Sequence, residues 1–96
     1  MKIKFLIPAQ WEVNDAVLWY NEQKVGLGME FLDQMDAGIR RIVAFPESHT
    51  AIEGGLRRCV FSRFPYCLIY GIEKGTIIIV AVAHLHREPR YWTERL

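Results

Sequence analysis

The spacing of apolar residues divides the first half of the chain into one short strand and two helices. Residues 2–7 alternate apolar with mainly basic side chains, which predicts a strand, and Pro8 ends that strand and can open a helix. Apolar residues then recur at helical spacing over about residues 9–24 and again over about residues 29–45. Because so few residues separate the two helices, we expect them to form an antiparallel hairpin.

Three glycines and Glu12 have expected roles in this helical hairpin. Gly26 and Gly28 bracket the break, where glycine easily adopts the left-handed conformation that ends a helix. Gly38 is expected to let the two helices approach closely. Glu12 is expected to face solvent with the other acidic residues of the first helix.

The second half of the chain predicts three strands. Residues 56–62, 66–72 and 76–84 are rich in β-branched and aromatic residues, and a polar loop over residues 47–55 precedes them. Short connections imply antiparallel neighbours. The third run is apolar at both alternating positions, so it should be the central strand, covered on both faces. The helical hairpin would cover one face, and residues 89–96 would cover part of the other.

Together these elements predict one α+β domain spanning residues 1–96. Their order is β-α-α-β-β-β(-α), with a curved antiparallel sheet packed on the N-terminal helical hairpin. Hydrophobic residues make up 51% of the chain, so a core can form without a metal or a disulfide. Cys59 and Cys67 lie symmetrically about Arg63, where a hairpin could place them opposite each other. Buried free thiols are favoured over a disulfide.

Charge is distributed unevenly along the chain. Residues 1–54 carry five basic and eight acidic residues, a net −3, whereas residues 55–96 carry seven basic and three acidic residues, a net +4. Such a dipolar surface could steer an acidic partner onto the sheet side. The N-terminal apolar run is too short for a secretory signal, and no segment approaches the length of a transmembrane helix. We therefore expect a soluble cytoplasmic protein without membrane contact.

Several short motifs follow one another in a recognisable order. They are Ala-Val-x-Trp-Tyr (16–20), Gly-Leu-Gly-x-Glu-Phe-Leu (26–32), Leu-Arg-Arg (56–58), Arg-Phe-Pro-Tyr (63–66), Ala-Val-Ala-His (81–84) and Arg-x-Pro-x-Tyr-Trp (87–92). In this order the chain resembles the RelE/ParE superfamily of bacterial toxins, which belong to type II toxin–antitoxin, or plasmid stabilisation, systems. The resemblance covers nearly the whole chain and is closer to the ParE-like branch.

The resemblance implies a toxin that inhibits growth when free and is neutralised by a cognate antitoxin. ParE-like members poison DNA gyrase, whereas RelE-like members cleave mRNA inside the ribosome. A third possibility is a degenerate toxin that only binds its antitoxin. We expect no cofactor and no metal site, because the pair His84-x-His86 lacks a nearby cysteine or carboxylate pattern.

The residues that RelE-like nucleases use are largely missing. The arginine three residues before the second strand's tyrosine is replaced by Cys67, three residues before Tyr70. The basic residue of the preceding strand falls on Val60, and the arginine after the third strand falls on Leu85. Losing one arginine that faces a transition state raises a barrier by roughly 2–4 kcal/mol. A gyrase-directed toxin is therefore favoured over a nuclease.

A nuclease would have to rely on a different set of side chains. The catalytic candidates are Arg58, His84, Arg87 and Tyr91. Histidine is a suitable acid or base near neutral pH. The pair Tyr91-Trp92 has a simpler role, because aromatic pairs commonly anchor a terminal segment to the core.

The candidates for partner binding come from the first helix and the strands. They are Trp11, Trp19, Arg57, Arg58 and Arg63. Helix tryptophans more often pack in a core, but exposed ones would mark a protein interface. Arg57 and Arg58 should point to opposite faces of their strand, and Arg63 is typical of a solvated turn. We expect an acidic, partly disordered antitoxin segment to fold across the first helix and a basic sheet rim that includes Arg87.

Overall fold

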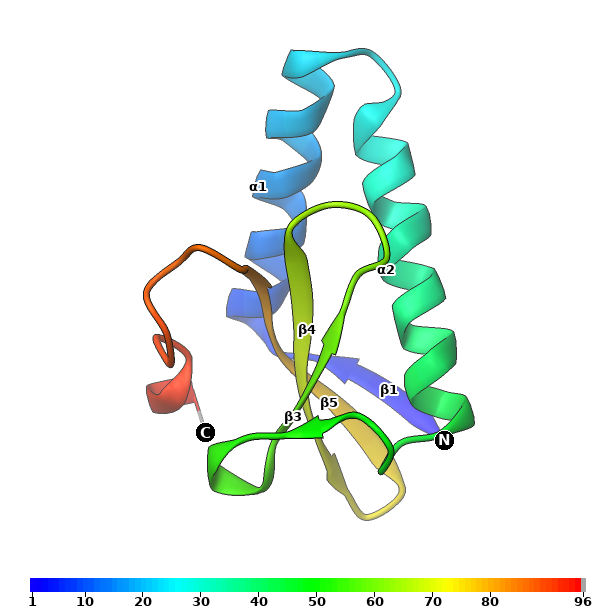
Figure 1. Cartoon of the computed structure of the whole chain (residues 1–96), viewed down its shortest axis with the longest axis vertical. Helices are drawn as coiled ribbons and strands as arrows, with labels where there is room; N and C mark the ends of the chain where they lie inside the picture. Colours follow the sequence, from blue (N-terminus) through cyan, green and yellow to red (C-terminus); the bar gives the residue numbers. More distant parts are fainter. Residues whose placement is uncertain (96) are drawn as a thin grey trace.

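The computed structural model describes residues 1–95, which form a helical hairpin and a five-stranded sheet (Figure 1). The elements are β1 (Lys2–Phe5), α1 (Ile7–Gln23), α2 (Leu27–Ala44), β2 (Thr50–Ala51), β3 (Arg57–Val60), β4 (Tyr66–Glu73) and β5 (Thr76–His84). Two short 3-10 turns, η1 (Glu53–Gly55) and η2 (Thr93–Arg95), complete the fold. Neither helix within residues 1–95 is long and apolar enough to cross a membrane.

The sheet is mixed, in the order β1-β5-β4-β3-β2. The pairs β2–β3, β3–β4 and β4–β5 are antiparallel, as predicted. The prediction is wrong for β1, which runs parallel to β5 with Ile3 opposite Ile77. A long helical hairpin rather than a tight turn follows β1, so nothing forces its direction to be antiparallel. The two-residue strand β2 lies inside the predicted loop. Strand β5 lies inside the sheet, between β1 and β4, but the central strand of the five is β4 rather than β5, because β1 adds only one strand beyond β5 while β3 and β2 lie beyond β4.

A bulge in β5 places two consecutive residues on the same face of the sheet. Ile69 pairs with Ala81 and Tyr70 pairs with Ile79, which leaves Val80 without a partner on β4. Val80 and Ala81 both pack into the core on the second face of the sheet, whereas Ile79 and Val82 face the helices.

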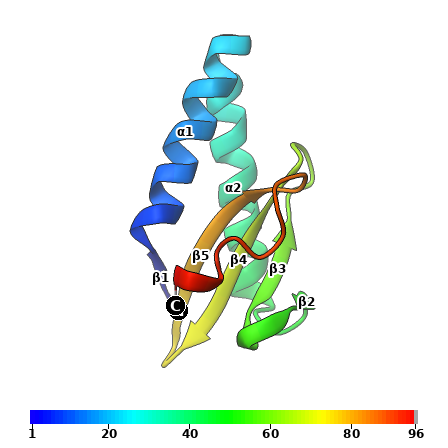
Figure 2. The same cartoon turned by 90° about the vertical axis from the view of Figure 1, so that its left-hand side faces the viewer.

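Hydrophobic clusters fill both faces of the sheet. On the first face, Val13 of α1 and Phe31 of α2 belong to one cluster with Leu68 and Tyr70 of β4. On the second face, the C-terminal tail (residues 85–95) crosses the strands, as Figure 2 shows. Tyr91 and Trp92 pack there against a cluster of small and aliphatic side chains. The predicted cover of the second face by the end of the chain is confirmed.

Helix α1 begins at Ile7, two residues earlier than predicted, and Pro8 lies in its first turn. Proline fits there because the first N–H groups of a helix have no partner within it.

Gly28 rather than Gly38 allows the helices to meet, since a Cβ on Gly28 would lie 2.7 Å from the carbonyl oxygen of Val17 on α1. A Cβ on Gly38 would instead lie 3.2 Å from Leu68 of the sheet. The predicted role of Gly38 is therefore wrong.

The two cysteines are free and buried, as predicted. They do not lie opposite each other, because Cys59 pairs with Leu68 and Cys67 pairs with Val60. That offset of one residue turns the thiols to opposite faces of the sheet. Burial raises the pKa of the Cys67 thiol to about 11.

Candidate protein-binding site

The side chain of Glu12 connects α1, β5 and the C-terminal tail. Its Oε1 accepts hydrogen bonds from the Val82 N–H at 3.0 Å and from Arg95 Nη1 at 2.8 Å. Its Oε2 accepts one from Arg95 Nη2 at 3.1 Å and another from the Tyr91 hydroxyl. Arg87 Nη1 lies 3.6 Å from Oε2. The expectation that Glu12 faces solvent is wrong.

Glu12 and Arg95 cap an edge of the sheet that no strand covers within residues 1–95. Strand β1 pairs with β5 only as far as Ile79. Beyond that residue, Glu12 accepts from the Val82 N–H, and Arg95 Nη1 donates to the Val80 carbonyl oxygen at 3.0 Å. Side chains thus replace the missing strand, which satisfies the backbone groups of an otherwise open edge.

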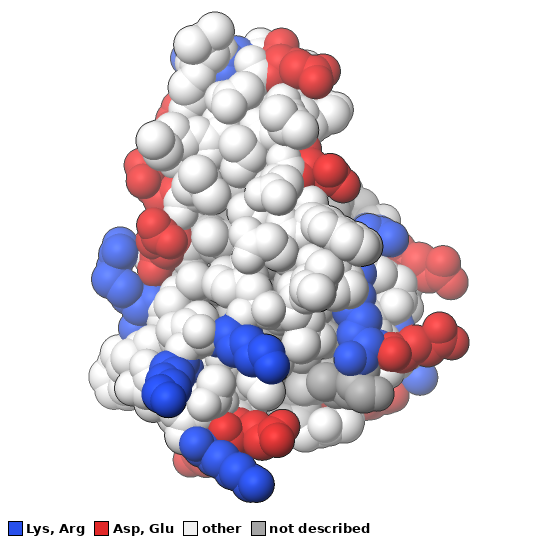
Figure 3. Space-filling view, turned by 180° about the vertical axis from the view of Figure 1, so that it is seen from behind, with Lys and Arg blue, Asp and Glu red and all other residues white. Residues whose placement is uncertain are grey.

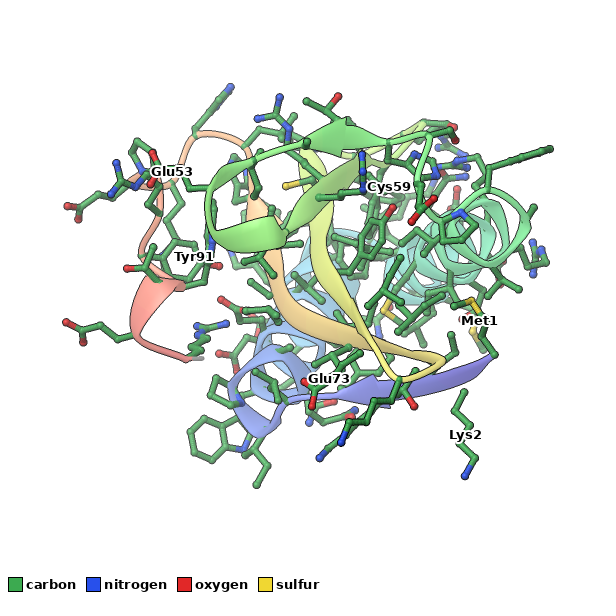
Figure 4. The ribbon with its side chains drawn as sticks, turned by 90° about the horizontal axis from the view of Figure 1, so that it is seen from below. Met1, Lys2, Glu53, Cys59, Glu73 and Tyr91 are labelled. Carbon is green, nitrogen blue, oxygen red and sulfur yellow. The ribbon has the colours of Figure 1, made fainter. Side chains whose placement is uncertain are left out.

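Two arginines also surround the ring of Tyr91. The guanidinium carbon of Arg87 lies 3.8 Å from the ring centroid, and that of Arg95 lies 5.0 Å from it. Burial raises the pKa of Tyr91, and its hydrogen bond to Glu12 raises it further. Hydrogen bonding to Glu12 also raises the pKa of Arg95. The Tyr91 hydroxyl therefore stays protonated and fixes the tail to α1. Figure 4 shows Tyr91 on the side of the tail that is nearer to the sheet.

A groove of about 270 Å³ lies between α1 and the end of β5, next to Glu12. We call it the α1–β5 groove, and its walls include Asp15, Trp19, Tyr66, His84 and Arg87. It combines aromatic surface with a cation, which suits an amphipathic peptide segment.

Both tryptophans of α1 are exposed, so the packing role usual for helix tryptophans does not apply. Trp11 is 63% exposed and Trp19 is 56% exposed. Trp11 forms a stripe with Ile7 and Leu18, which are also exposed and lie on the same side of the helix. This outer stripe (Ile7, Trp11 and Leu18) faces away from the core. Helix α1 therefore has apolar residues on two faces, of which the fold uses only one.

The arginine candidates occupy different surfaces. Arg57 Nη1 donates to the His49 carbonyl oxygen at 2.8 Å, next to Tyr70 on the helix side of the sheet. Arg58 lines a hollow on the second face. Arg87 lies at the α1–β5 groove. The two neighbouring arginines point to opposite faces, as predicted, but together with Arg87 they do not form the expected shared rim.

Arg63 fixes the loop between β3 and β4 against α2. Its guanidinium pairs with Glu30 at 3.1 Å, and its backbone N–H donates to Gln34 Oε1 at 2.9 Å. Arg63 is 63% exposed at this turn, as predicted, and its contacts hold the loop against α2.

Basic side chains are concentrated on one part of the surface. In the view from behind, most Lys and Arg residues lie in the lower half, over the sheet, while mainly acidic residues border the helices (Figure 3). Lys2 and Lys4 of β1 and Lys74 of the turn between β4 and β5 are exposed basic residues. These lysines at the β1 edge were not singled out as candidates from the sequence.

The four catalytic candidates do not line one hollow. His84 and Arg87 line the α1–β5 groove, the Tyr91 hydroxyl is bound to Glu12, and Arg58 lies in a separate hollow. His84 Nδ1 accepts the backbone N–H of His86 at 3.0 Å. Within residues 1–95, no three His, Cys, Asp or Glu side chains are placed to hold a metal ion.

The fold of this chain matches that of a protein of known structure. No protein-family model matches the chain, and no curated protein matches its sequence. A solved structure described as the chromosomal ParDE TA system from P. aeruginosa contains a chain that matches with a TM-score of 0.78 and 14% sequence identity. The match covers 90% of this chain and 97% of that one. The predicted α+β, ParE-like fold is thereby confirmed.

Proposed function

We propose that the protein is the toxin of a type II toxin–antitoxin module and that a cognate antitoxin holds it inactive. The fold supports this proposal, since it matches a chain of a ParDE TA (toxin–antitoxin) system over nearly its full length. The observation that carries it is the exposure of Trp11 and Trp19 on α1. Exposed large aromatic residues are typical of a surface that a protein partner covers, and Trp19 also lines the α1–β5 groove.

The antitoxin segment should combine apolar side chains with carboxylates. Its apolar residues would pack on Trp19 and on the outer stripe of α1. A carboxylate would pair with Arg87, which is half exposed although it lies near Glu12. Such a segment fits the notion of a partly disordered antitoxin tail that folds on binding.

We further propose DNA gyrase as the target. Cys67, Val60 and Leu85 occupy positions where RelE-like toxins carry cations, so the charge needed to stabilise a phosphorane is missing. The Tyr91 hydroxyl donates to Glu12, and Arg58 lies in another hollow. A toxin that inhibits its target by binding to it does not need catalytic side chains gathered in one site.

Induced expression with and without the neighbouring gene tests the proposal. We expect growth arrest without the neighbour, rescue with it, and gyrase-dependent DNA breaks in a cleavage assay. Transcripts cut inside codons would instead indicate a ribosome-dependent nuclease, whose toxicity Arg58→Ala or Tyr91→Phe should abolish. Normal growth in the absence of the neighbour would refute a toxin and leave a degenerate antitoxin-binding domain.

A matched pair of variants tests the binding surface. Trp19→Ala should weaken the complex with the antitoxin by about 30-fold or more, as truncation of an aromatic anchor commonly does. Phe45→Ala removes an aromatic side chain that is 68% exposed at the end of α2 and does not line the groove, so it should leave affinity unchanged. Equal affinities for both variants would contradict the proposed surface.

A further inference from the structure

The second face of the sheet contains a hollow that the proposed function does not use. It has a volume of about 340 Å³ and lies between the η1 region and the C-terminal tail. Ile52, Pro89 and Trp92 provide apolar walls. We call it the tail hollow. The tail crosses the face of the sheet opposite the helices (Figure 2), and the tail hollow shares no lining residue with the α1–β5 groove.

One cation of the tail hollow has no counter-ion among residues 1–95. Arg58, on β3, forms no ion pair within residues 1–95 and is exposed. The other arginine of the hollow, Arg90, pairs with Glu53 at 3.1 Å. The hollow therefore offers a single uncompensated positive charge beside apolar surface.

The tail hollow is held in shape from both sides. The pair between Arg90 and Glu53 links the tail to η1, and Figure 4 shows Glu53 beside the tail. Trp92 packs into the core of the second face, with its ring 5.3 Å from that of Tyr91. The backbone of Arg90 has φ = 67°, which is unfavourable for a residue other than glycine. Surrounding contacts must over-determine such a conformation, and strain of this kind gathers at ligand clamps.

We propose that the tail hollow binds a protein segment that carries one carboxylate next to an apolar side chain. The carboxylate would pair with Arg58, and the apolar side chain would lie against Trp92 and Ile52. Nucleic acid fits less well, because a polyanion would bring several phosphates to one free cation. Glu53 at the rim, and Glu94 next to the lining residue Thr93, would repel them.

Tryptophan fluorescence allows a direct test on the isolated full-length chain. The double variant Trp11→Phe/Trp19→Phe replaces two exposed indoles and leaves Trp92 as the reporter. The probes are acetyl-Asp-Leu-amide, its neutral counterpart acetyl-Asn-Leu-amide, and the trinucleotide UUU. We expect a saturable change with the aspartyl probe and affinity about 10-fold weaker for the asparaginyl probe, as loss of a charge-assisted bond predicts.

Variants of the reporter chain assign the effect to Arg58. Arg58→Gln should remove the preference for the aspartyl probe, whereas Arg40→Gln, at an exposed position of α2, should retain it. Equal urea midpoints would show that both variants remain folded. Tighter binding of UUU than of the aspartyl probe, no saturable response, or a preference that survives Arg58→Gln would each overturn the proposal. The probe assay measures binding to the isolated chain, so its outcome is distinguishable from that of the growth assay that tests the proposed function.

Discussion

Arg95 and Glu12 are 83 residues apart in the chain, and their side chains form two parallel hydrogen bonds of 2.8 and 3.1 Å. The side chains are only 16% and 12% exposed, respectively. This bidentate pair links the first helix to the last turn and completes the capped edge of β5. Its partly buried position makes it more important than a surface ion pair of the same geometry.

Glu12→Gln should destabilise the protein by about 1–3 kcal/mol, because a neutral amide leaves Arg95 partly buried without a counter-ion. Urea denaturation measures the difference. Glu22→Gln, at an exposed position of the same helix, is the matched control and should change stability by less than about 0.5 kcal/mol. Equal midpoints for the two variants would contradict the role of Glu12 as the centre of this network.

Gly28→Ala should destabilise the helical hairpin, although alanine favours a helix by about 1 kcal/mol over glycine. The new Cβ would lie 2.7 Å from the Val17 carbonyl oxygen, and a backbone atom cannot easily move away. We expect a net loss of about 1–2 kcal/mol by thermal or urea unfolding. Gly38→Ala meets only the flexible end of Leu68 at 3.2 Å, so it should cost less. The reverse order would contradict this account of the helix contact.

Stability should fall as the pH rises from 9 to 11, in part through Cys67. Burial raises the pKa of this thiol from 9.0 to about 11. Within this interval the unfolded chain loses the proton while the folded chain keeps it, so unfolding is favoured as the pH rises. A shift of this size corresponds to about 2–3 kcal/mol, fully lost only above pH 11.

The Cys67→Ala variant isolates this contribution. It lacks the thiol, so its urea midpoint should decline less between pH 8 and pH 10.5 than that of the wild type. Tyrosines with raised pKa, such as Tyr70, affect both proteins alike. Parallel pH profiles would show that Cys67 does not contribute.

Tyr70→Phe should destabilise the protein by about 1–2 kcal/mol. The Tyr70 ring is completely buried, and its hydroxyl donates to the Pro46 carbonyl oxygen at 2.6 Å, which joins β4 to the end of α2. Tyr66→Phe is the matched control, since the Tyr66 hydroxyl has no hydrogen-bond partner within residues 1–95. Chemical denaturation of the two variants should give a larger loss for Tyr70→Phe. An equal loss would contradict the importance of this bond.

The regular elements could be predicted from the sequence because each carries its own pattern. The uninterrupted apolar run of β5 indicated a strand buried on both faces, and its bounds, Thr76–His84, match the prediction. Strand β2 could not be predicted, because Thr50 is polar and Ala51 is small, and two such residues form no strand pattern of their own. They are a strand only through their pairing with β3.

The centre of the candidate site was missed for a different reason. Glu12 is acidic, so it was assigned to the solvent side, although it lies three residues after Ala9 and four before Ala16, both of which are buried. Residues three and four positions apart lie on the same side of a helix, so this spacing predicts that Glu12 faces the sheet. The exposure of Trp11 was equally hidden, because apolar periodicity does not distinguish a face that meets the core from one that awaits a partner.

The parallel pairing of β1 with β5 also affects the order of events during translation. Lys2–Phe5 can form their ladder only after residues 76–79 have been synthesised, and the bidentate pair needs Arg95 as well. Contacts of such large sequence separation form late. A nascent chain therefore cannot complete the hydrogen-bond network around Glu12, or cap the free edge of β5, until Arg95 has been synthesised.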